Sequence, residues 1–166
     1  MNLEGKLFIR ENLFDDETAR DYVIQKVLTD IDSDSEFEIK NQELLRQEYN
    51  PFELMQKLAS LGYDVMLGYD NEEIIGHIAY QQHQEEDKIS WHMFRIFIPE
   101  EKRGRGYFIP LFKEVIKKAR TYKISRLKMG NEKTKNPYMV VLINALKRRE
   151  KKLGIKIDEE NHLLTL

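Results

Sequence analysis

The spacing of hydrophobic residues changes several times along the chain, and each change predicts a secondary-structure element. Residues 6–12 (KLFIREN) alternate apolar and polar side chains, which is typical of a half-buried strand. Residues 15–31 have apolar side chains at helical spacing behind an acidic N-cap, and residues 50–62 predict a second helix that ends at Gly62. The acidic, serine-containing stretch between them, residues 32–43, is expected to be a loop.

From Tyr63 onward the pattern becomes that of strands. Three extended runs are separated by short polar turns, which indicates an antiparallel meander. These runs are residues 64–70, 71–84 and 87–98. The rest of the chain predicts a helix, a strand, a basic helix and a final hairpin, at residues 109–122, 124–130, 138–154 and 155–166.

The predicted order of elements is β-α-α-β-β-β-α-β-α-β-β. This order indicates an α+β (mixed α/β) fold in which about four helices flank a central, largely antiparallel sheet. A length of 166 residues is typical of one domain, so we expect a single domain over residues 1–166.

The composition excludes several kinds of protein. The chain has no cysteine, which excludes a disulfide scaffold, a thiolate metal site and a cysteine nucleophile. No run of apolar residues is long enough to span a membrane, and the first residues lack the apolar core of a signal peptide. A cytoplasmic location is therefore the simplest expectation.

The charges are divided unevenly between the two parts of the chain. The net charge is −2, but residues 1–100 carry 9 Lys and Arg against 22 Asp and Glu, whereas residues 101–166 carry 18 against 7. Such a division is expected where a protein binds one anionic and one cationic partner. It is equally expected where surface helices of the two parts form ion pairs with each other.

The decapeptide EKRGRGYFIP, residues 101–110, joins a predicted strand to a predicted helix and has the composition of an anion site. The start of a helix offers backbone N–H groups without partners, and the helix dipole favours negative charge there. Gly104 and Gly106 permit a positive φ and have no Cβ to keep a phosphate away from the backbone. Arg103 and Arg105 add forked donors, so a phosphate or pyrophosphate is the predicted guest.

This segment resembles the acyl-CoA-binding motif of the GNAT superfamily of N-acyltransferases, Arg/Gln-x-x-Gly-x-Gly/Ala. Residues 103–106 (RGRG) fit its first four positions, and Phe108 occupies the last, where the family usually has a small residue. The predicted order of elements is also that of the family over essentially the whole chain. The basic helix is similar to the family's second conserved helix, which ends here in residues 152–155 (KLGI).

The resemblance implies an N-acetyltransferase with acetyl-CoA as co-substrate and a direct transfer of the acetyl group to a primary amine. The residues that it assigns to cofactor binding are Phe97, Ile98, Arg103, Gly104, Arg105, Gly106, Tyr107 and Phe108. A backbone N–H in the segment 95–98 is implied to polarise the thioester carbonyl.

Acyl transfer to an amine also needs a general base and a general acid. We name His92 as the first candidate base and Glu101 as the second, with His83 and Glu85 in the neighbouring turn. Tyr138 and, within the loop, Tyr107 are candidate acids; core or surface positions remain the alternative for each.

Other histidine roles are not favoured by the sequence. His77, within the run IIGHIAY, is expected to be a structural strand residue. The four histidines also lack the spacing of metal ligands, so we predict no metal site.

The acceptor is expected to be a small-molecule or protein amine. An acidic segment, residues 30–43, lies where the family often borders its acceptor site, which favours a cationic acceptor. The basic stretch KRREKKLGIK is expected to be a solvated helix face, with one Lys or Arg reaching the 3′-phosphate of CoA, rather than a nucleic-acid site. A homodimer is plausible from the resemblance alone.

An alternative from another functional class is an inactive GNAT-fold protein that senses a ligand or binds another protein. Phe108 favours this alternative, as does Glu150, which stands where the family often has a tyrosine acting as general acid. A third, weaker alternative is an RNA-associated protein with a basic face.

Overall fold

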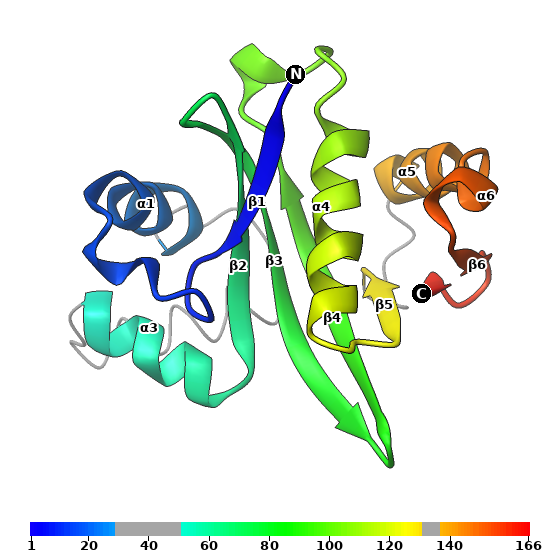
Figure 1. Ribbon diagram of the computed structural model, residues 1–166, viewed down its shortest axis with the longest axis horizontal. Coiled ribbons are helices and arrows are strands. Elements are labelled where there is room, and N and C mark those ends of the chain that lie inside the picture. The colour runs from blue at the N-terminus through cyan, green and yellow to red at the C-terminus, as the bar shows by residue number, and fades with distance from the viewer. Residues whose placement is uncertain (29–50, 131–136) are drawn as a thin grey trace.

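The computed structural model describes residues 1–28, 51–130 and 137–166, and the predicted loop 32–43 lies outside these ranges. Seven strands form one sheet in the order β1-β2-β3-β4-β5-β7-β6 (Figure 1). Neighbouring strands are antiparallel except β4 and β5, which are parallel. The strands are β1 (Leu3–Leu7), β2 (Tyr63–Asp70), β3 (Glu73–Glu85), β4 (Lys88–Phe97), β5 (Arg126–Met129), β6 (Lys156–Asp158) and β7 (Leu163–Thr165).

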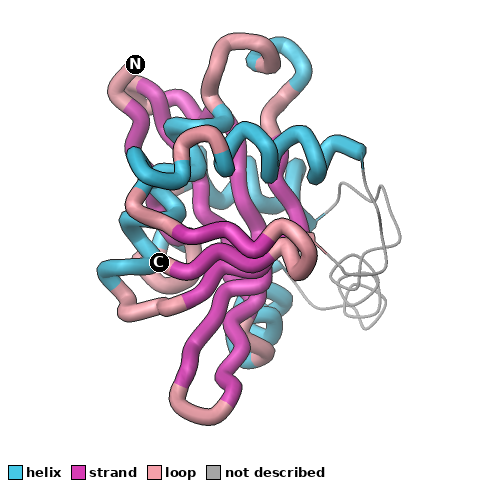
Figure 2. The backbone as a smooth tube through the Cα atoms, turned by 90° about the vertical axis from the view of Figure 1, so that its right-hand side faces the viewer, coloured by secondary structure: helices cyan, strands magenta, loops and turns pink. Residues whose placement is uncertain are grey.

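Helices cover both faces of the sheet (Figures 1 and 2). One hydrophobic core lies between the sheet and helices α1 and α3, and a larger one lies between the sheet and α4, α5 and α6. The described helices are α1 (Glu17–Tyr22), which continues as a π-helical segment (Val23–Leu28), α3 (Pro51–Ser60), α4 (Phe108–Thr121), α5 (Pro137–Lys147) and α6 (Glu150–Leu153). The predicted fold class is therefore confirmed.

The first strand lies earlier in the chain than predicted. It ends at Leu7, and the following turn is held by the buried carboxylate of Asp64, which accepts hydrogen bonds from the N–H groups of Ile9 (2.8 Å) and Arg10 (3.1 Å). Asn12 then adopts a positive φ of 52° before a 3₁₀ turn. The alternation in residues 6–12 was thus a misleading signal, because the second half of that segment is a turn stabilised by a distant residue.

The predicted basic helix 138–154 is two helices. α5 ends at Lys147, where the N–H of Arg149 bonds to the carbonyl of Leu146 (2.9 Å) in a tighter, three-residue turn. α6 then begins at Glu150 and ends at Gly154, which has the left-handed φ of 65° expected at a helix end. Five described helices therefore stand where about four were predicted.

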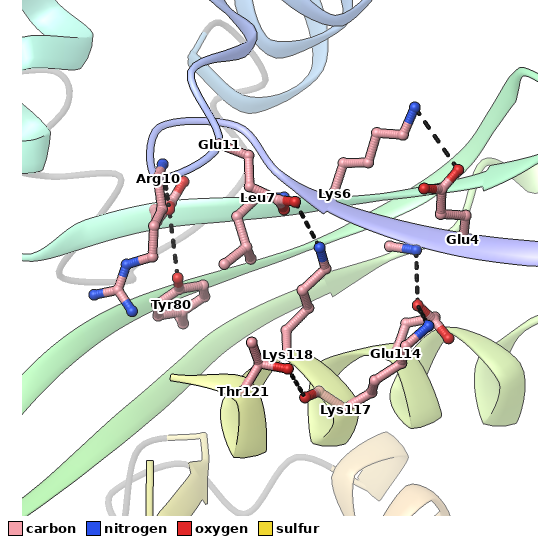
Figure 3. A network of polar contacts seen from close by, with 12 residues as sticks. Glu4, Lys6, Leu7, Arg10, Glu11, Tyr80, Glu114, Lys117, Lys118 and Thr121 are labelled. Atoms are coloured by element: carbon pink, nitrogen blue, oxygen red, sulfur yellow. Dashed lines mark hydrogen bonds and ion pairs between the residues drawn. The ribbon is translucent and has the colours of Figure 1, made fainter. Parts of the chain in front are cut away.

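Helix α4 packs very closely on the first two strands. A Cβ at Gly5 would lie 2.8 Å from Cβ of Glu114, and a Cβ at Gly68 would lie 2.5 Å from a methyl carbon of Leu111. The Glu114 carboxylate accepts a hydrogen bond from the N–H of Gly5 (3.1 Å), and Lys118 forms an ion pair with Glu11 at 2.6 Å (Figure 3). These contacts hold α4, and with it the preceding loop, against the sheet.

Strand β4 carries a β-bulge at Phe94. Ala79 pairs with Arg95 but Tyr80 pairs with Met93, so β4 has one residue more than β3 at this point. Pairing with β5 ends at the same place, where the N–H of Gly130 donates to the carbonyl of Met93 (2.9 Å). Beyond the bulge, β4 has β3 on one side and no other strand of the described chain on the other.

No described helix is long and apolar enough to cross a membrane.

Candidate functional site

The loop between β4 and α4 is anchored to the sheet by its own charged and aromatic side chains. Nε of Arg103 donates to the carbonyl of Ile98 at 2.8 Å. Lys102 forms an ion pair with Glu73 on β3, and the hydroxyl of Tyr107 donates to Asp70 at the end of β2 (3.1 Å). The loop is therefore fixed in shape although most of its residues are exposed.

Both loop glycines adopt the conformation that glycine alone enters easily. Gly104 has φ of 74° and Gly106 has φ of 78°, and a Cβ built at either position would meet no atom within 4 Å. The space beside both residues is open. The backbone there can be approached by a phosphate oxygen, and any larger residue would both strain the loop and occupy this space.

The start of α4 leaves backbone donors free. Tyr107 is the N-cap and gives no side-chain hydrogen bond to the helix, and the N–H of Leu111 donates to the carbonyl of Tyr107 (2.9 Å). Pro110 has no N–H, so the remaining first-turn donors belong to Phe108 and Ile109. Together with the exposed guanidinium groups of the loop, they form a cluster of donors able to bind an anion.

Phe108 does not block this site. Its side chain is half-buried and packs against the larger core, with its ring 5.8 Å from the buried ring of Phe112. The bulky residue at the last motif position therefore points inward, while its N–H remains at the start of the helix.

The free edge of β4 leads into the loop. Residues 95–97 pair with β3 on one side only, and Gly76 allows β3 to approach, because a Cβ there would lie 2.5 Å from the carbonyl oxygen of Phe97. The side of β4 that faces away from β3 at Phe97 is able to hydrogen-bond to an extended ligand. The predicted cofactor-binding residues Phe97 and Ile98 lie at this end of the strand.

His92 lies on β4 just before the bulge and is half-buried. Its ring stacks on that of His83 at 3.9 Å, and its Nε2 lies 3.1 Å from the hydroxyl of Ser90. Burial lowers the pKa of His92 to about 4, and electrostatic interactions with His83 and Lys128 act in the same direction. The ring is therefore neutral at neutral pH.

The structure does not bring the two candidate bases together. Glu101 is exposed in the 3₁₀ turn Glu100–Lys102, on the loop side of β4. His92 is five residues before Phe97 on the same strand, which corresponds to roughly 16 Å along β4. Tyr138 is in the first turn of α5, but its side chain lies outside the described residues.

His77 is a buried strand residue, as the sequence predicted, and it has an unusual environment. His77 on β3 is fully buried; its Nδ1 lies 3.0 Å from the hydroxyl of Tyr22 on α1, and its ring stacks on Phe97 at 5.2 Å. Its Nε2 is buried without a hydrogen-bond partner in the described structure. Burial lowers the pKa of His77 to about 3, with the charge of Arg95 adding to the effect. Its polar character in an apolar run was the only available signal.

No group of three or more His, Asp or Glu side chains suited to a metal ion occurs within residues 1–28, 51–130 and 137–166.

The chain matches the model of a known protein family. The model of the acetyltransferase (GNAT) family matches residues 26–142. No curated protein sequence matches the chain.

Several solved structures share the fold. A GNAT-family acetyltransferase from Desulfovibrio desulfuricans has a TM-score of 0.54 at 14% identity, with 95% of this chain and 87% of that chain covered. An aminoglycoside acetyltransferase from an uncultured soil metagenomic sample has a TM-score of 0.53 at 12% identity, with 95% and 94% covered. The NatC complex bound to Gag peptide and CoA gives 0.53 at 13% identity, with 88% and 84% covered. At these identities the likeness shows the fold alone.

Proposed function

Because the chain belongs to the GNAT acetyltransferase family, we propose that it transfers an acetyl group from acetyl-CoA directly to a primary amine of a small molecule or protein. One observation carries the proposal. The loop before α4 has two left-handed glycines with open space beside them, at a helix start whose backbone donors are not capped by a side chain.

The residues for cofactor binding divide into three groups. The N–H groups around Gly104, Gly106 and Phe108 bind the pyrophosphate, and Arg103 and Arg105 neutralise its charge. The edge of β4 at Phe97 and Ile98, beyond the pairing with β5, binds the amide-containing arm of CoA. Tyr107 holds the loop in place through Asp70. Acetyl-CoA supplies the activated acetyl thioester.

His92 is the proposed general base. Its neutral ring lies next to the bulge, where the free edge of β4 begins, and Ser90 orients its Nε2. Tyr138 is the proposed general acid, and Glu101 is a second candidate base that lies on the loop side of the strand. No covalent enzyme intermediate is proposed, because the chain has no cysteine and no activated nucleophile is recognised in its sequence.

The acceptor is proposed to be cationic, because residues 1–100 carry a large excess of carboxylates. An aminoglycoside acetyltransferase and a peptide-bound complex with this fold illustrate only that the fold serves more than one acceptor class. We further propose that residues 1–166 form one catalytic domain, and that a homodimer forms in solution.

A second candidate function is a GNAT-fold ligand sensor or protein-interaction module without catalysis. The observation that favours it is Glu150, at the position where the family often has its acidic tyrosine. Its carboxylate is held by Lys147 at 2.7 Å. An assay of turnover distinguishes the two functions, because a module of this kind binds the cofactor without releasing free CoA.

The first test is titration calorimetry of the protein with acetyl-CoA, with ATP as a control for general anion binding. We expect one-to-one binding that prefers acetyl-CoA, and loss of binding in Gly106→Glu, whose side chain would fill the open space beside the loop. Arg105→Glu is the companion variant, because Arg105 is exposed and its change leaves the fold intact. Retained binding in a folded Gly106→Glu protein would argue against the loop as the cofactor site.

The second test is a screen of amine acceptors in which released CoA is detected by a thiol reagent. The protein contributes no background, because it has no cysteine. Turnover that is lost in His92→Gln but not in Glu101→Gln supports His92 as the base. Binding of acetyl-CoA without turnover on any amine supports the sensor or interaction module instead.

A further inference from the structure

Two histidine rings stack on each other on the long β3–β4 hairpin (Figure 1). The ring centroids of His83 and His92 are 3.9 Å apart, and the angle between the ring planes is 13°. The two residues are diagonal neighbours across the strands, because His83 pairs with Ser90 and Gln81 pairs with His92. Both rings are half-buried. We call His83 and His92 the histidine pair.

The ring of His83 is held by the side chain of Gln81. Nε2 of Gln81 donates to the carbonyl of Leu61, directly after α3 (2.9 Å), so the orientation of the amide is fixed. Its Oε1, which can only accept, lies 3.1 Å from Nε2 of His83. His83 therefore carries a proton on Nε2, and its neutral form has the lone pair on Nδ1.

The ring of His92 is held by Ser90. Nε2 of His92 lies 3.1 Å from Oγ of Ser90, which is only 6% exposed. Because Nε2 faces this buried hydroxyl, Nδ1 is the ring nitrogen left for an acceptor amine. A neutral imidazole accepts a proton on Nδ1 only when Nε2 already carries one. Ser90 fits this tautomer, since its hydroxyl oxygen can accept the hydrogen bond from Nε2–H.

The groups around His92 favour one proton on the histidine pair over two. The charged groups that face His92 are His83 on β3, Lys128, which is its partner on β5, and Glu85 at the end of β3. Burial, His83 and Lys128 lower the pKa of His92, and Glu85 acts in the opposite direction. A protonated His83 repels a second proton, whereas the face of a neutral His83 ring stabilises a cation stacked on it.

We propose that His83 is a positioning residue for His92, and that the stacked rings act as one unit that holds a single proton on Nδ1 of His92. This inference rests on the proposed function. It explains why a ring that is neutral at the start of the reaction lies directly against a second imidazole rather than against an apolar side chain.

The proton follows a balanced path. The ammonium group of the acceptor loses one proton to Nδ1 of His92, and the lone pair of the amine forms the C–N bond to the acetyl carbon. The C–S bond then breaks, and its electron pair leaves with the sulfur of CoA. The sulfur receives a proton from the general acid, which regains one from the second N–H of the amine nitrogen. His92 passes its own proton to solvent.

The first experiment follows the Hε1 signals of the histidines by NMR from about pH 3.5 to about pH 8. The chain has four histidines, and the signal that disappears in His92→Gln belongs to His92. His83→Phe keeps a ring without a charge, and His83→Ala removes the ring. The matched control is Gln84→Ala, an exposed neighbour on the opposite face of β3. Thermal unfolding checks that the variants are folded.

We expect the titration midpoint of His92 to rise by about one pH unit in His83→Phe, because the neighbouring charge is gone while the stack remains. The midpoint should rise further in His83→Ala, because His92 also becomes more exposed, and it should not change in Gln84→Ala. If both His83 variants leave the midpoint where it is in the wild-type protein, the two rings do not act as a unit and the inference is overturned.

The second experiment measures kcat and KM for an acceptor amine over the same pH range. His83→Ala should lower kcat about tenfold, because the His92 ring loses its fixed orientation, and should leave acetyl-CoA binding unchanged. His83→Phe should recover most of the lost kcat, because its ring restores the stack. The acid limb of its kcat/KM profile should nevertheless move upward together with the NMR midpoint. An unaltered kcat and pH profile in His83→Ala would overturn the positioning role.

Failure of the proposed function gives a different pattern. In that case the wild-type protein acetylates no amine, whereas the NMR titration still measures the response of His92 to His83→Phe. A shifted midpoint would then support the histidine pair as a proton-binding unit without the reaction, and an unchanged midpoint would overturn the pair as well.

Discussion

Two buried ionisable side chains dominate the chemistry at the scale of single residues, and they have opposite pH dependences. Asp64 lies at the beginning of β2 and His77 in the middle of β3, and both are enclosed by the protein. Burial disfavours the charged form of each, so it raises the pKa of the acid and lowers the pKa of the imidazole. Each pKa shift predicts how the free energy of unfolding depends on pH.

For Asp64, stability is predicted to fall as the pH rises. Burial raises the pKa of Asp64 from 3.8 to about 6, although the N–H groups of Ile9, Val65 and Arg10 act in the opposite direction. The native state therefore binds the proton more tightly than the unfolded state. The resulting stabilisation is fully present below the unfolded pKa of 3.8 and is lost as the pH rises through the folded pKa of about 6. Relative to Asp64→Asn, the free energy of unfolding should fall by about 3 kcal/mol between about pH 3 and pH 7.

Urea denaturation of both proteins across this range measures the difference. If the difference in unfolding free energy between the two proteins stays constant with pH, the three backbone donors stabilise the carboxylate anion and offset the effect of burial on its pKa.

For His77, stability is predicted to fall as the pH decreases. Burial lowers the pKa of His77 from 6.5 to about 3. The stabilisation by the neutral ring is fully present above the unfolded pKa of 6.5. It is lost as the pH falls toward the folded pKa. Relative to His77→Phe, the wild-type free energy of unfolding should decrease by about 3 kcal/mol between about pH 7 and pH 4.5. Denaturation with guanidinium chloride at several pH values tests this, and a His77→Phe protein with the same pH profile would contradict it.

At the scale of elements, the close approach of α4 to the sheet decides where the loop lies. Gly68 on β2 leaves room for the fully buried Leu111, the fourth residue of α4. Because the helix starts at Phe108, its distance from the sheet sets the position of the first-turn donors. Small residues on the strands therefore contribute to the candidate site without touching it.

Gly68→Ala is predicted to lower the free energy of unfolding by about 1–3 kcal/mol, because its Cβ would lie 2.5 Å from a methyl carbon of Leu111. Chemical denaturation measures the change. Leu111→Val, combined with Gly68→Ala, should cost less than the sum of the single changes, because the shorter side chain relieves the overlap. Additive effects in this double-mutant cycle would show that the two residues do not compete for space.

At the scale of the whole molecule, the acidic front and the basic back of the chain pack closely and are also joined by ion pairs. In the ranges that the structure describes, the ion pairs between the two parts are Lys118 with Glu11 and Lys102 with Glu73. The loop proposed to bind the pyrophosphate belongs to the basic part, where an excess of positive charge favours anions.

Lys118→Met is predicted to lower the free energy of unfolding by about 0.5–1 kcal/mol at low salt and by less at high salt, because the ion pair with Glu11 at 2.6 Å is partly screened from solvent. Lys117→Met is the control, since Lys117 is 69% exposed and its contact with Glu114 is 3.5 Å long. Thermal unfolding at two salt concentrations compares them, and equal effects of the two changes would assign the loss to the aliphatic stem of the side chain.

The order of elements, the family resemblance and the glycine-rich loop were all predictable from the sequence. Hydrophobic period, turn residues and a strand followed by glycines and a helix are local signals, encoded within a few neighbouring residues. The turn predicted at Asp70 and Asn71 lies one residue later, at Asn71 and Glu72, where both φ angles are positive.

Only the tertiary structure determined the bulge at Phe94, the burial of His77 beside Tyr22, the inward direction of Phe108 and the stacking of His83 on His92. Each of these depends on which distant segments meet and in which register. A register shift or a ring stack between strands has no signature in either segment alone, because it follows from the packing of the whole core.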